Sequence, residues 1–256
     1  MQNYCKTIGA LAAASALVAG NASAGTTPTT TTAPASEPAS AVSYELHTGY
    51  SNQYLFRGVD LGDNLVEVGL DVSGEWNNVG LSAGAWYGSY DVGYEGFHGL
   101  YDISTNELDL YAEVSYDFGF ATGAVGYIAY LNDDNSLFDA EDYQEVYFSL
   151  SRDFGIFATS LTYFWGVEGE NNGYSELAFT RSFELSPCFA LNLGTNVGFL
   201  VEEGEFTSWN SKASLDWAFV EHAKLSPFVA VAVGIEDNWS DNATELVGGT
   251  MLSVSF

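Results

Sequence analysis

From residue 43 onward, apolar and polar residues alternate along the chain, which is the pattern of β-strands with one apolar face. The clearest run is 65–76, where valine, leucine and tryptophan fill most even positions. The odd positions of this run include Glu67, Asp71 and Glu75. Asn77 and Asn78 follow as a turn signal. The run therefore predicts a strand with one apolar and one acidic face.

About 12 such segments follow one another, and no helical pattern occurs beyond residue 24. Tight turns alternate with longer, acidic, Gly-rich loops such as 90–106 and 132–142. Short turns on one side and longer loops on the other are typical of outer-membrane barrels. The pattern predicts an all-β, antiparallel, up-and-down transmembrane β-barrel with strands at 44–57, 65–76, 79–89, 107–116, 120–131, 143–151, 156–167, 174–185, 189–200, 206–218, 225–235 and 245–256.

The last predicted strand, 245–256, runs to the final residue with Leu252, Val254 and Phe256 on one face. A strand at a chain end needs pairing partners, and in a closed barrel it pairs with the first strand and leaves no edge in lipid. A terminal Phe with apolar residues two and four positions earlier resembles the assembly signal of bacterial outer-membrane proteins. We therefore expect the barrel assembly machinery to be a partner through this strand.

The region before the strands divides into two segments. Residues 1–24 have Lys6, an apolar run over 8–19 and a small-residue ending, which predicts a secretory signal peptide. Residues 25–42 are rich in Thr, Pro and Ala and predict a disordered linker. The barrel is then expected over 43–256. Removal of Cys5 with the signal peptide would leave Cys188 as a single cysteine, without a disulfide or a cysteine-based metal site.

The chain is strongly acidic, with 6 Lys and Arg against 34 Asp and Glu and a net charge of −28. This balance excludes nucleic acid as an expected ligand. Outer-membrane lipid and lipopolysaccharide are expected partners, with divalent cations bridging to their phosphates. Aromatic residues at the strand ends indicate two membrane girdles: Trp76, Phe118, Phe154, Trp217, Phe219 and Phe256 at the periplasmic end, and Tyr54, Phe56, Tyr87, Tyr130, Trp165 and Trp239 at the outer end.

One basic residue conflicts with the simple alternation. Arg181 falls on the lipid-facing side between Phe179 and Phe183. At the bilayer midplane such an arginine would cost about 2–4 kcal/mol. Either a bulge turns it into the lumen, or its side chain reaches toward the periplasmic end. The sequence slightly favours the bulge.

The first strand and its turn carry a family resemblance. The segment Ser51 to Val59 reads Ser-Asn-Gln-Tyr-Leu-Phe-Arg-Gly-Val, and Asp63-Asn64 follows. This arrangement resembles the amino-terminal signature of the TorF-type porin family of bacterial outer-membrane barrels. The resemblance covers about 15 residues and includes no catalytic residue. It implies a porin-like barrel in the bacterial outer membrane without naming a solute.

The inward face of such a barrel would carry the function. Carboxylates dominate this face and would concentrate cations, so we expect a porin-like channel for passive diffusion of small hydrophilic solutes, with cation preference. Small inward glycines and large inward aromatics together predict a constricted, wet passage, although the glycines could equally serve to bend strands. The candidate pore-lining residues are Glu45, Arg57, Glu67, Asp71, Glu75, Asp109, Glu113, Glu145, Glu176, Lys212 and Asp216.

The role of Arg57 has two interpretations. It could fix the first loop by pairing with Asp60 or Asp63, or it could form part of a constriction. The pairing is the favoured interpretation.

Three other functional hypotheses stay open at this stage. Eight strands are filled by side chains and 16 leave a channel, so a 12-stranded barrel could be a non-conducting surface barrel with an adhesion or structural role. A hydrolase is less favoured, because His47 and Ser51 lie about 13 Å apart along an extended strand and no hydrolase motif occurs. The acidic outer loops could hold calcium or magnesium, but neither run has a defined calcium-loop spacing, so a solvated surface that faces lipopolysaccharide is favoured. No cofactor is expected. The candidate ligands are Asp133, Asp134, Asp139, Glu141 and Asp142 in one loop and Glu202, Glu203 and Glu205 in another.

Overall fold

A computed structural model describes residues 42–96, 99–132, 142–235 and 244–256. The expected signal peptide (1–24), nearly all of the expected linker, most of the acidic run 132–142 and the expected girdle residue Trp239 lie outside this description. Among the described residues, no helix has the length and apolar character that a membrane crossing requires.

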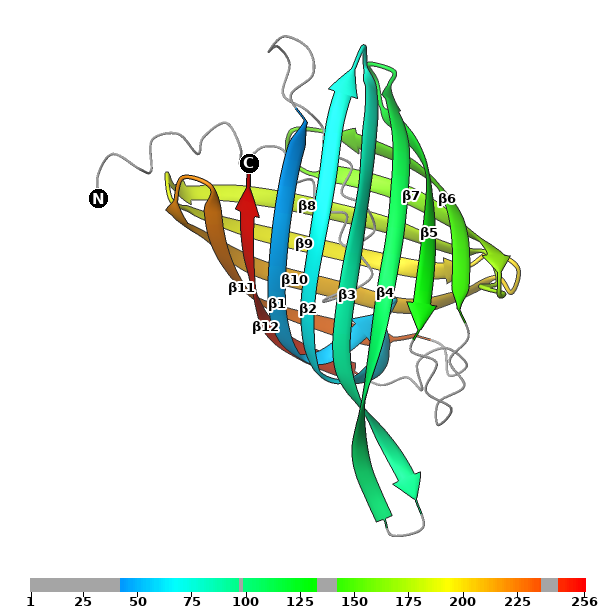
Figure 1. Cartoon of the computed structure of the whole chain (residues 1–256). Coiled ribbons are helices and arrows are strands. Elements are labelled where there is room, and N and C mark those ends of the chain that lie inside the picture. The colour runs from blue at the N-terminus through cyan, green and yellow to red at the C-terminus, as the bar shows by residue number, and fades with distance from the viewer. Residues whose placement is uncertain (1–41, 97–98, 133–141, 236–243) are drawn as a thin grey trace.

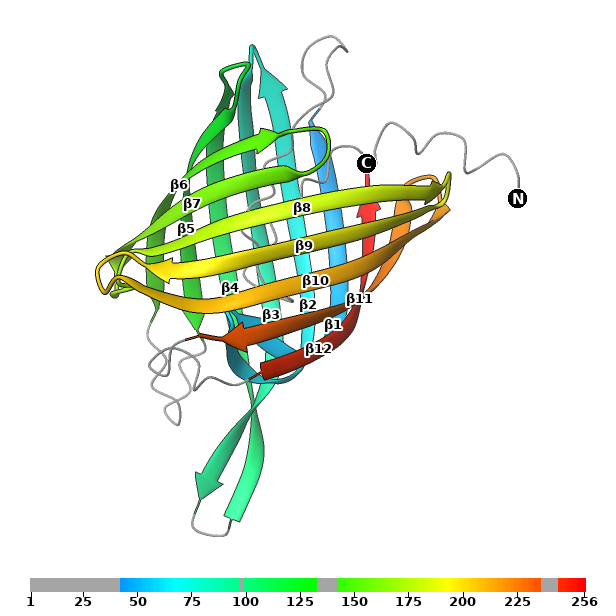
Figure 2. The ribbon, with the colours of Figure 1, turned by 180° about the vertical axis from the view of Figure 1, so that it is seen from behind.

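The described residues form one closed antiparallel barrel (Figure 1). Each strand pairs with its sequence neighbours, and the first strand pairs with the last. Figure 2 shows the far wall, made by β8 to β11. The strands are β1 (Ser43–Phe56), β2 (Val59–Trp76), β3 (Val79–Gly96), β4 (Gly99–Asp117), β5 (Thr122–Asn132), β6 (Tyr143–Asp153), β7 (Ala158–Glu168), β8 (Tyr174–Ser186), β9 (Phe189–Leu200), β10 (Glu205–Val220), β11 (Ala223–Gly234) and β12 (Thr244–Ser255).

The closure between β1 and β12 confirms the expected role of the last strand. Their register runs from Glu45 opposite Ser255 to Ser51 opposite Gly249. The backbones of Tyr44 and Phe256 also exchange two hydrogen bonds of 2.9 and 3.0 Å. The barrel therefore has no open edge in the bilayer region, as a lipid environment requires.

The two barrel ends differ in their connections. We call the end that holds Ser43, Phe256 and the short turns the turn end, and the opposite end the loop end (Figure 1). The short turns agree with the sequence expectation. The expected long loop 90–106 does not exist as such, because β3 and β4 continue in register from Ser89–Asn106 to Gly96–Gly99. They project beyond the loop end as a two-stranded ribbon. Pairing that begins in the barrel extends the strands through a Gly-rich segment of weak strand propensity.

The outer surface is an apolar belt, as expected for a barrel in lipid. Large side chains such as Val66, Leu81, Val114 and Leu161 are exposed on it. All six expected turn-end girdle residues are exposed, and so are Tyr87 and Trp165 on the loop side. The closed barrel and this belt are those of a bacterial outer-membrane protein.

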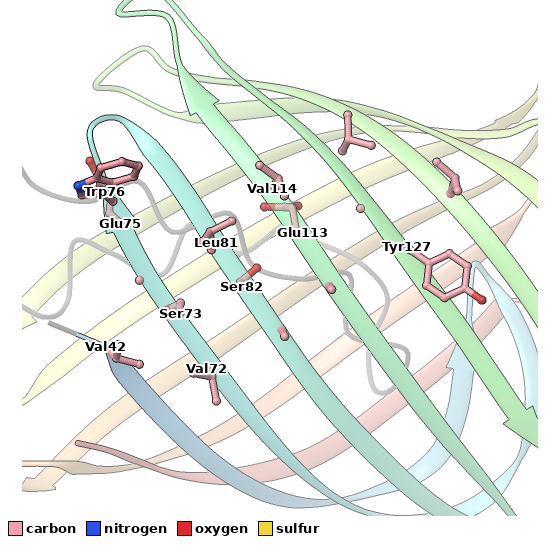
Figure 3. Close-up of a pocket in the computed structure, with 16 residues that line it drawn as sticks. Val42, Val72, Ser73, Glu75, Trp76, Leu81, Ser82, Glu113, Val114 and Tyr127 are labelled. Carbon is pink, nitrogen blue, oxygen red and sulfur yellow. The ribbon is translucent and has the colours of Figure 1, made fainter. Parts of the chain in front are cut away.

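A shallow groove lies on this outer surface over β2 to β5, toward the turn end (Figure 3). It has a volume of about 670 Å³, and apolar outward side chains such as Val72, Leu81 and Val114 line it. Ala83 and Ala112, which pair across β3 and β4, also line it between these larger side chains. The groove belongs to the lipid-facing belt and is not an entrance to the lumen.

Three residues expected in the outer girdle instead face the lumen. Tyr54 and Tyr130 are only 0% and 5% exposed, and both belong to a core cluster inside the barrel, against which Phe56 packs. Tyr54 and Phe56 belong to the hairpin between β1 and β2, whose end lies inside the barrel, so the alternation of a strand in the barrel wall does not apply to them. Tyr130 follows the regular alternation of β5, in which Ile128 and Tyr130 are buried and Tyr127 is exposed.

Arg181 stays on the lipid-facing side, so the favoured bulge is wrong. It pairs with Leu193, which is exposed on the outer surface, and the register around it is regular. Its guanidinium donates a hydrogen bond to the carbonyl of Ile156 in a turn-end connection and lies 4.8 Å from the Phe183 ring centroid. The side chain thus reaches the turn end, as long basic side chains do near a membrane interface.

Cys188, in the turn between β8 and β9, is disulfide-bonded in the structure of this chain. The expectation of a single cysteine concerns the chain after removal of residues 1–24, and it stays a prediction.

Candidate functional site

The first hairpin folds into the lumen, and this fold creates the site. Arg57 and Gly58 connect β1 and β2 with φ values of +51° and +83°. Two successive positive φ values are those of a tight type I′ hairpin turn. The register shift between Tyr54 and Leu55 lies just before this turn. We call the inward-folded residues 54–60 the plug.

The plug contacts most walls of the barrel. Leu55 joins a buried cluster with Phe228 and Val247 of β11 and β12. Tyr54 packs edge-on against Tyr90 of β3, with ring centroids 4.7 Å apart. The tip of the plug contacts β10, where the Ser208 hydroxyl donates a 3.2 Å hydrogen bond to the carbonyl of Arg57. The plug therefore crosses the lumen.

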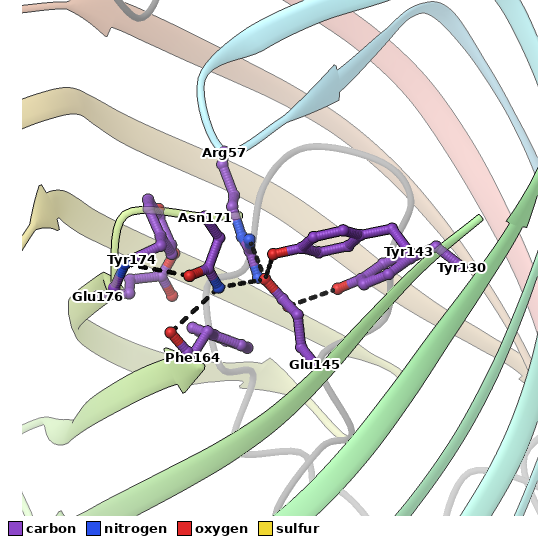
Figure 4. Close-up of polar contacts among 9 residues, drawn as sticks. Arg57, Tyr130, Tyr143, Glu145, Phe164, Asn171, Tyr174 and Glu176 are labelled. Carbon is purple, nitrogen blue, oxygen red and sulfur yellow. Dashed lines mark hydrogen bonds and ion pairs between the residues drawn. The ribbon is translucent and has the colours of Figure 1, made fainter. Parts of the chain in front are cut away.

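Arg57 forms a bidentate ion pair with Glu145 of β6 (Figure 4). The two N–O distances are 2.8 and 2.6 Å, and the residues are 5% and 0% exposed. Three further donors reach the Glu145 carboxylate: Asn171 at 2.7 Å, Tyr143 at 2.9 Å and Tyr130 at 3.2 Å. A buried ion pair is stable when its remaining lone pairs are hydrogen-bonded in this way.

Aromatic rings surround the Arg57 guanidinium. Its central carbon lies 4.4 Å from the ring centroids of both Phe164 and Tyr174, and 4.8 Å from that of Phe56. Cation–π contacts add to the ion pair at a desolvated site. The expected pairing of Arg57 with Asp60 or Asp63 is wrong, because the plug carries Arg57 across the lumen. Asp60 accepts hydrogen bonds from the Gln53 side chain at 3.0 Å and the Gly62 amide at 3.1 Å instead.

Aromatic donors accompany most of the other lumen carboxylates. Each pair joins a carboxylate to a hydroxyl or indole N–H, usually from another strand. This arrangement satisfies the charge where few basic residues are available. The pairs are Trp86–Glu67 at 2.7 Å, Tyr54–Glu107 at 2.7 Å, Tyr147–Glu113 at 2.8 Å, Tyr174–Glu176 at 3.4 Å and Tyr111–Asp71.

The wall made by β8 to β10 carries amides instead. Asn196 donates to Glu176 at 2.9 Å, and Asn210 donates to Asn196 at 2.8 Å. Asn192 accepts a 2.5 Å hydrogen bond from Ser182 nearer the turn end. One side of the lumen is therefore mainly acidic and aromatic. The other side is mainly lined by amides and hydroxyls, with Glu176, Lys212 and Asp216 as charged groups.

Exposure of the inward residues changes along the barrel. At the loop half, Trp86, Tyr174 and Leu200 belong to a buried cluster that fills the lumen together with the plug. Toward the turn end, the side chains of Asp71 and Lys224 are 37% and 32% exposed. The inward side chains are thus buried at the loop half and partly exposed toward the turn end. We call the part with exposed side chains the vestibule.

The remaining expected pore residues lie in or near the vestibule. Glu45 accepts a 3.0 Å hydrogen bond from Ser255. Asp216 lies 3.8 Å from Lys224, and the Lys212 amine lies 4.2 Å from the Phe228 ring centroid. Glu75 is exposed near the turn end of β2.

The sequence reasoning missed some of the lumen groups. Glu107 is inward and only 6% exposed, and its alternation with Asp109 and Glu113 was the signal that could have identified it. The donors Tyr54 and Asn171 had no such signal, because the plug and a loop-end turn bring them into the lumen. Tyr130 alternates with the exposed Tyr127 on β5, and that alternation was its signal.

Among the residues that the structure describes, no catalytic set surrounds His47. Its Nδ1 lies 3.3 Å from Asp71, and Nε2 has no hydrogen-bond partner. A Cβ added to Gly69 would lie 2.2 Å from this Nε2, so the ring leans over β2. Ser253 pairs with His47 from β12, on the other side of β1, and Ser51 donates to the Gln53 carbonyl. Among the described residues, no group of three metal-ligating side chains is close enough to hold a metal ion.

Solved structures of similar fold are outer-membrane barrels. The COG4313 outer membrane channel from Pseudomonas putida F1 matches with a TM-score of 0.53 and 12% identity, over 86% of this chain and 97% of that one. The NanC porin matches with a TM-score of 0.49 and 14% identity, over 82% and 98%. The outer membrane phospholipase A from Escherichia coli matches with a TM-score of 0.46 and 13% identity, over 83% and 92%.

No curated protein matches the chain. A family model described as "Bacterial protein of unknown function (Gcw_chp)" matches residues 35–230, most of the barrel. The chain therefore belongs to the Gcw_chp family of bacterial proteins.

Proposed function

We propose that this chain is a porin-like, cation-preferring channel for small hydrophilic solutes, held closed at the loop half by the plug. The observation that carries the proposal is the acidic lumen of a closed 12-stranded barrel. Inward carboxylates occur on β1, β2, β4, β6, β8 and β10, whereas Arg57 and Lys212 are the inward bases expected from the sequence. Carboxylates along a passage concentrate cations and repel anions.

The similarity of fold to a solved channel supports the channel part of the proposal, but not its selectivity. The solved barrel from Pseudomonas putida F1 is described as an outer membrane channel, and this chain resembles it in fold. The resemblance of Ser51 to Val59 to the TorF-type porin family points to the same class. That segment forms most of the plug, so the resemblance falls on the part of the chain that closes the lumen.

Passage through the barrel requires the plug to move. The inward side chains of the vestibule are partly exposed toward the turn end, and the plug with its aromatic neighbours fills the loop half. Displacement of residues 54–60 would break the Arg57–Glu145 ion pair and connect the vestibule to the loop end. We therefore propose that the described state is the closed state of the channel.

A second candidate function is a non-conducting surface barrel. The observation that favours it is the same filled loop half, in which Tyr54, Trp86 and Tyr174 have no exposed surface. The β3–β4 ribbon, which projects beyond the loop end, would then be the part that meets a partner (Figure 1). Conductance of variants with a released plug separates the two functions, because a non-conducting barrel stays silent in both states.

Ion selectivity tests the cation preference directly. In planar bilayers with a potassium chloride gradient, the reversal potential is expected to have the sign of cation selectivity. Asp71→Asn is expected to reduce it, because Asp71 is partly exposed in the vestibule. Glu221→Gln in the exposed β10–β11 turn is the matched control and should leave it unchanged. Anion selectivity of the conducting protein would contradict the proposed preference.

The proposed partners follow from the same architecture. We propose that β12, which ends beside Phe256, is the segment recognised by the barrel assembly machinery. We also propose that the belt contacts outer-membrane lipid, and that divalent cations bridge the acidic outer surface to lipopolysaccharide. We assign no enzymatic reaction and no cofactor to the chain.

A further inference from the structure

One buried carboxylate of the lumen lacks a hydrogen-bond donor. Asp109 of β4 has no exposed surface, and neither of its carboxyl oxygens has a partner. The other carboxylates deep in the loop half, such as Glu67, Glu107 and Glu145, each accept at least one hydrogen bond. Asp109 is therefore the exception among the buried acids of the described strands, because each of the others accepts a hydrogen bond.

The donors near Asp109 are already committed elsewhere. Trp86 and Tyr130 pair with Asp109 from β3 and β5. The indole N–H of Trp86 goes to Glu67, and the hydroxyl of Tyr130 goes to Glu145. An ionised carboxylate buried without donors or a counter-ion carries a very large desolvation cost. The Asp109 carboxyl group must therefore be neutralised in the folded barrel.

The carboxyl group of Glu107 lies within hydrogen-bonding reach of Asp109, two residues away on the same face of β4. Two ionised carboxylates cannot form a hydrogen bond with each other, and their negative charges repel. One proton on the pair supplies the hydrogen-bond donor and removes the repulsion, as it does in other close carboxyl pairs. We infer that Asp109 carries a proton and donates a hydrogen bond to Glu107, so that the two residues form a proton-binding site in the closed lumen.

The groups that face this site leave it no other source of neutralisation. They are Tyr54 of β1, Tyr90 of β3, Tyr130 of β5 and Glu145 of β6. None of these groups carries a positive charge. Arg57 is the cation of this region, and Glu145 already engages it through both nitrogens. Glu107 accepts a hydrogen bond from Tyr54 of the plug through Oε2, and its carboxylate can accept a second one from a protonated Asp109.

The proton site couples closure of the lumen to pH. Loss of the proton would place a second negative charge beside Glu107, among the rings of Trp86 and Tyr130 that pack under the plug. Water would then have to enter the aromatic cluster to solvate the charge. If the barrel conducts as proposed above, alkaline pH is expected to favour the open state.

Infrared spectroscopy of the folded protein in lipid vesicles tests the inference without relying on conductance. A protonated carboxylic acid has a carbonyl band that a carboxylate lacks. Asp109→Asn is expected to remove one such band at neutral pH, and Asp109→Ser serves if the first variant does not fold. Glu67→Gln is the control, because it removes an acid that has an indole donor, and it should leave the band in place.

Thermal stability gives a second readout. Wild-type protein is expected to lose stability as pH rises, because the folded state holds a proton that the unfolded chain has released. Asp109→Asn should show a smaller loss and match the wild type at low pH, since the amide replaces a neutral acid. An unchanged band in both Asp109 variants would overturn the inference. A stabilisation that depends on sodium or calcium and vanishes in Asp109→Asn would also overturn it, in favour of a bound cation.

Discussion

Replacement of Arg57 by alanine is expected to destabilise the folded barrel by about 3–5 kcal/mol, the usual cost of removing one partner of a buried ion pair. The variant leaves Glu145 with no exposed surface and no counter-ion. It also removes the cation that Phe164 and Tyr174 enclose. The free energy of unfolding, measured by urea titration of protein folded in lipid vesicles, checks this value.

The same variant should raise conductance across planar bilayers, since the plug loses its strongest contact with the opposite wall. Arg57→Ala combined with Glu145→Gln is expected to recover part of the stability, because the second change removes the unpaired charge. The double variant should nevertheless conduct. Arg152→Ala is the matched control: Arg152 is exposed at the turn end beside Phe154, and its loss should change neither quantity.

Two results would contradict the role given to Arg57. A stability within 0.5 kcal/mol of wild type, the usual range for surface changes, would show that the ion pair does not hold the plug. A variant that is destabilised but shows no conductance would favour the non-conducting barrel over the channel. Stability and conductance therefore separate the packing of the plug from the function proposed for the lumen.

The barrel could be predicted from the sequence because a membrane environment constrains the side-chain pattern of every strand. A strand between lipid and lumen must alternate, and a one-residue error exposes a whole row of side chains to the wrong side. This constraint located strands such as 174–185 and 189–200 closely. It also placed Glu67, Asp109, Glu113 and Glu145 on the lumen side, where the structure has them buried.

The site could not be predicted to the same depth, because its contacts join residues far apart in the chain. Arg57 and Glu145 are 88 positions apart, and no periodic pattern connects a turn residue to a strand across the lumen. Proximity in sequence instead favoured Asp60 and Asp63 as partners. This error arose because the hairpin that carries Arg57 lies inside the barrel, where its tip contacts β6 and β10.

Arg181 illustrates the opposite error. The cost of a lipid-facing arginine made a bulge attractive, but the regular register of β8 and β9 there keeps the side chain outside. Its length resolves the conflict, because the guanidinium reaches the Ile156 carbonyl at the turn end. Strict alternation therefore predicted the side of Arg181 correctly. It gave wrong predictions in the hairpin between β1 and β2, which leaves the barrel wall.

Substitution of Gly58 by alanine is expected to expel the tip of the plug from the lumen. Gly58 has a φ of +83°, where a Cβ costs about 1–2 kcal/mol in backbone strain. The new Cβ would also lie 2.2 Å from Oγ and 2.4 Å from Cβ of Ser208. A Cβ atom cannot move aside by rotation of its side chain, so the strand β10 or the plug must shift. Conductance should rise and the free energy of unfolding should fall by more than the strain alone.

Gly119→Ala supplies the matched control for this experiment. Gly119 lies in a turn-end connection with a φ of +82°, and an added Cβ there would meet nothing within 4 Å. It should therefore show the backbone strain without the clash, and conductance should not change. Ser208→Gly in the Gly58→Ala background removes both clashing atoms and should restore closure. Equal destabilisation by the two alanine variants, with no conductance from either, would mean that the tip does not pack against β10 as the structure shows.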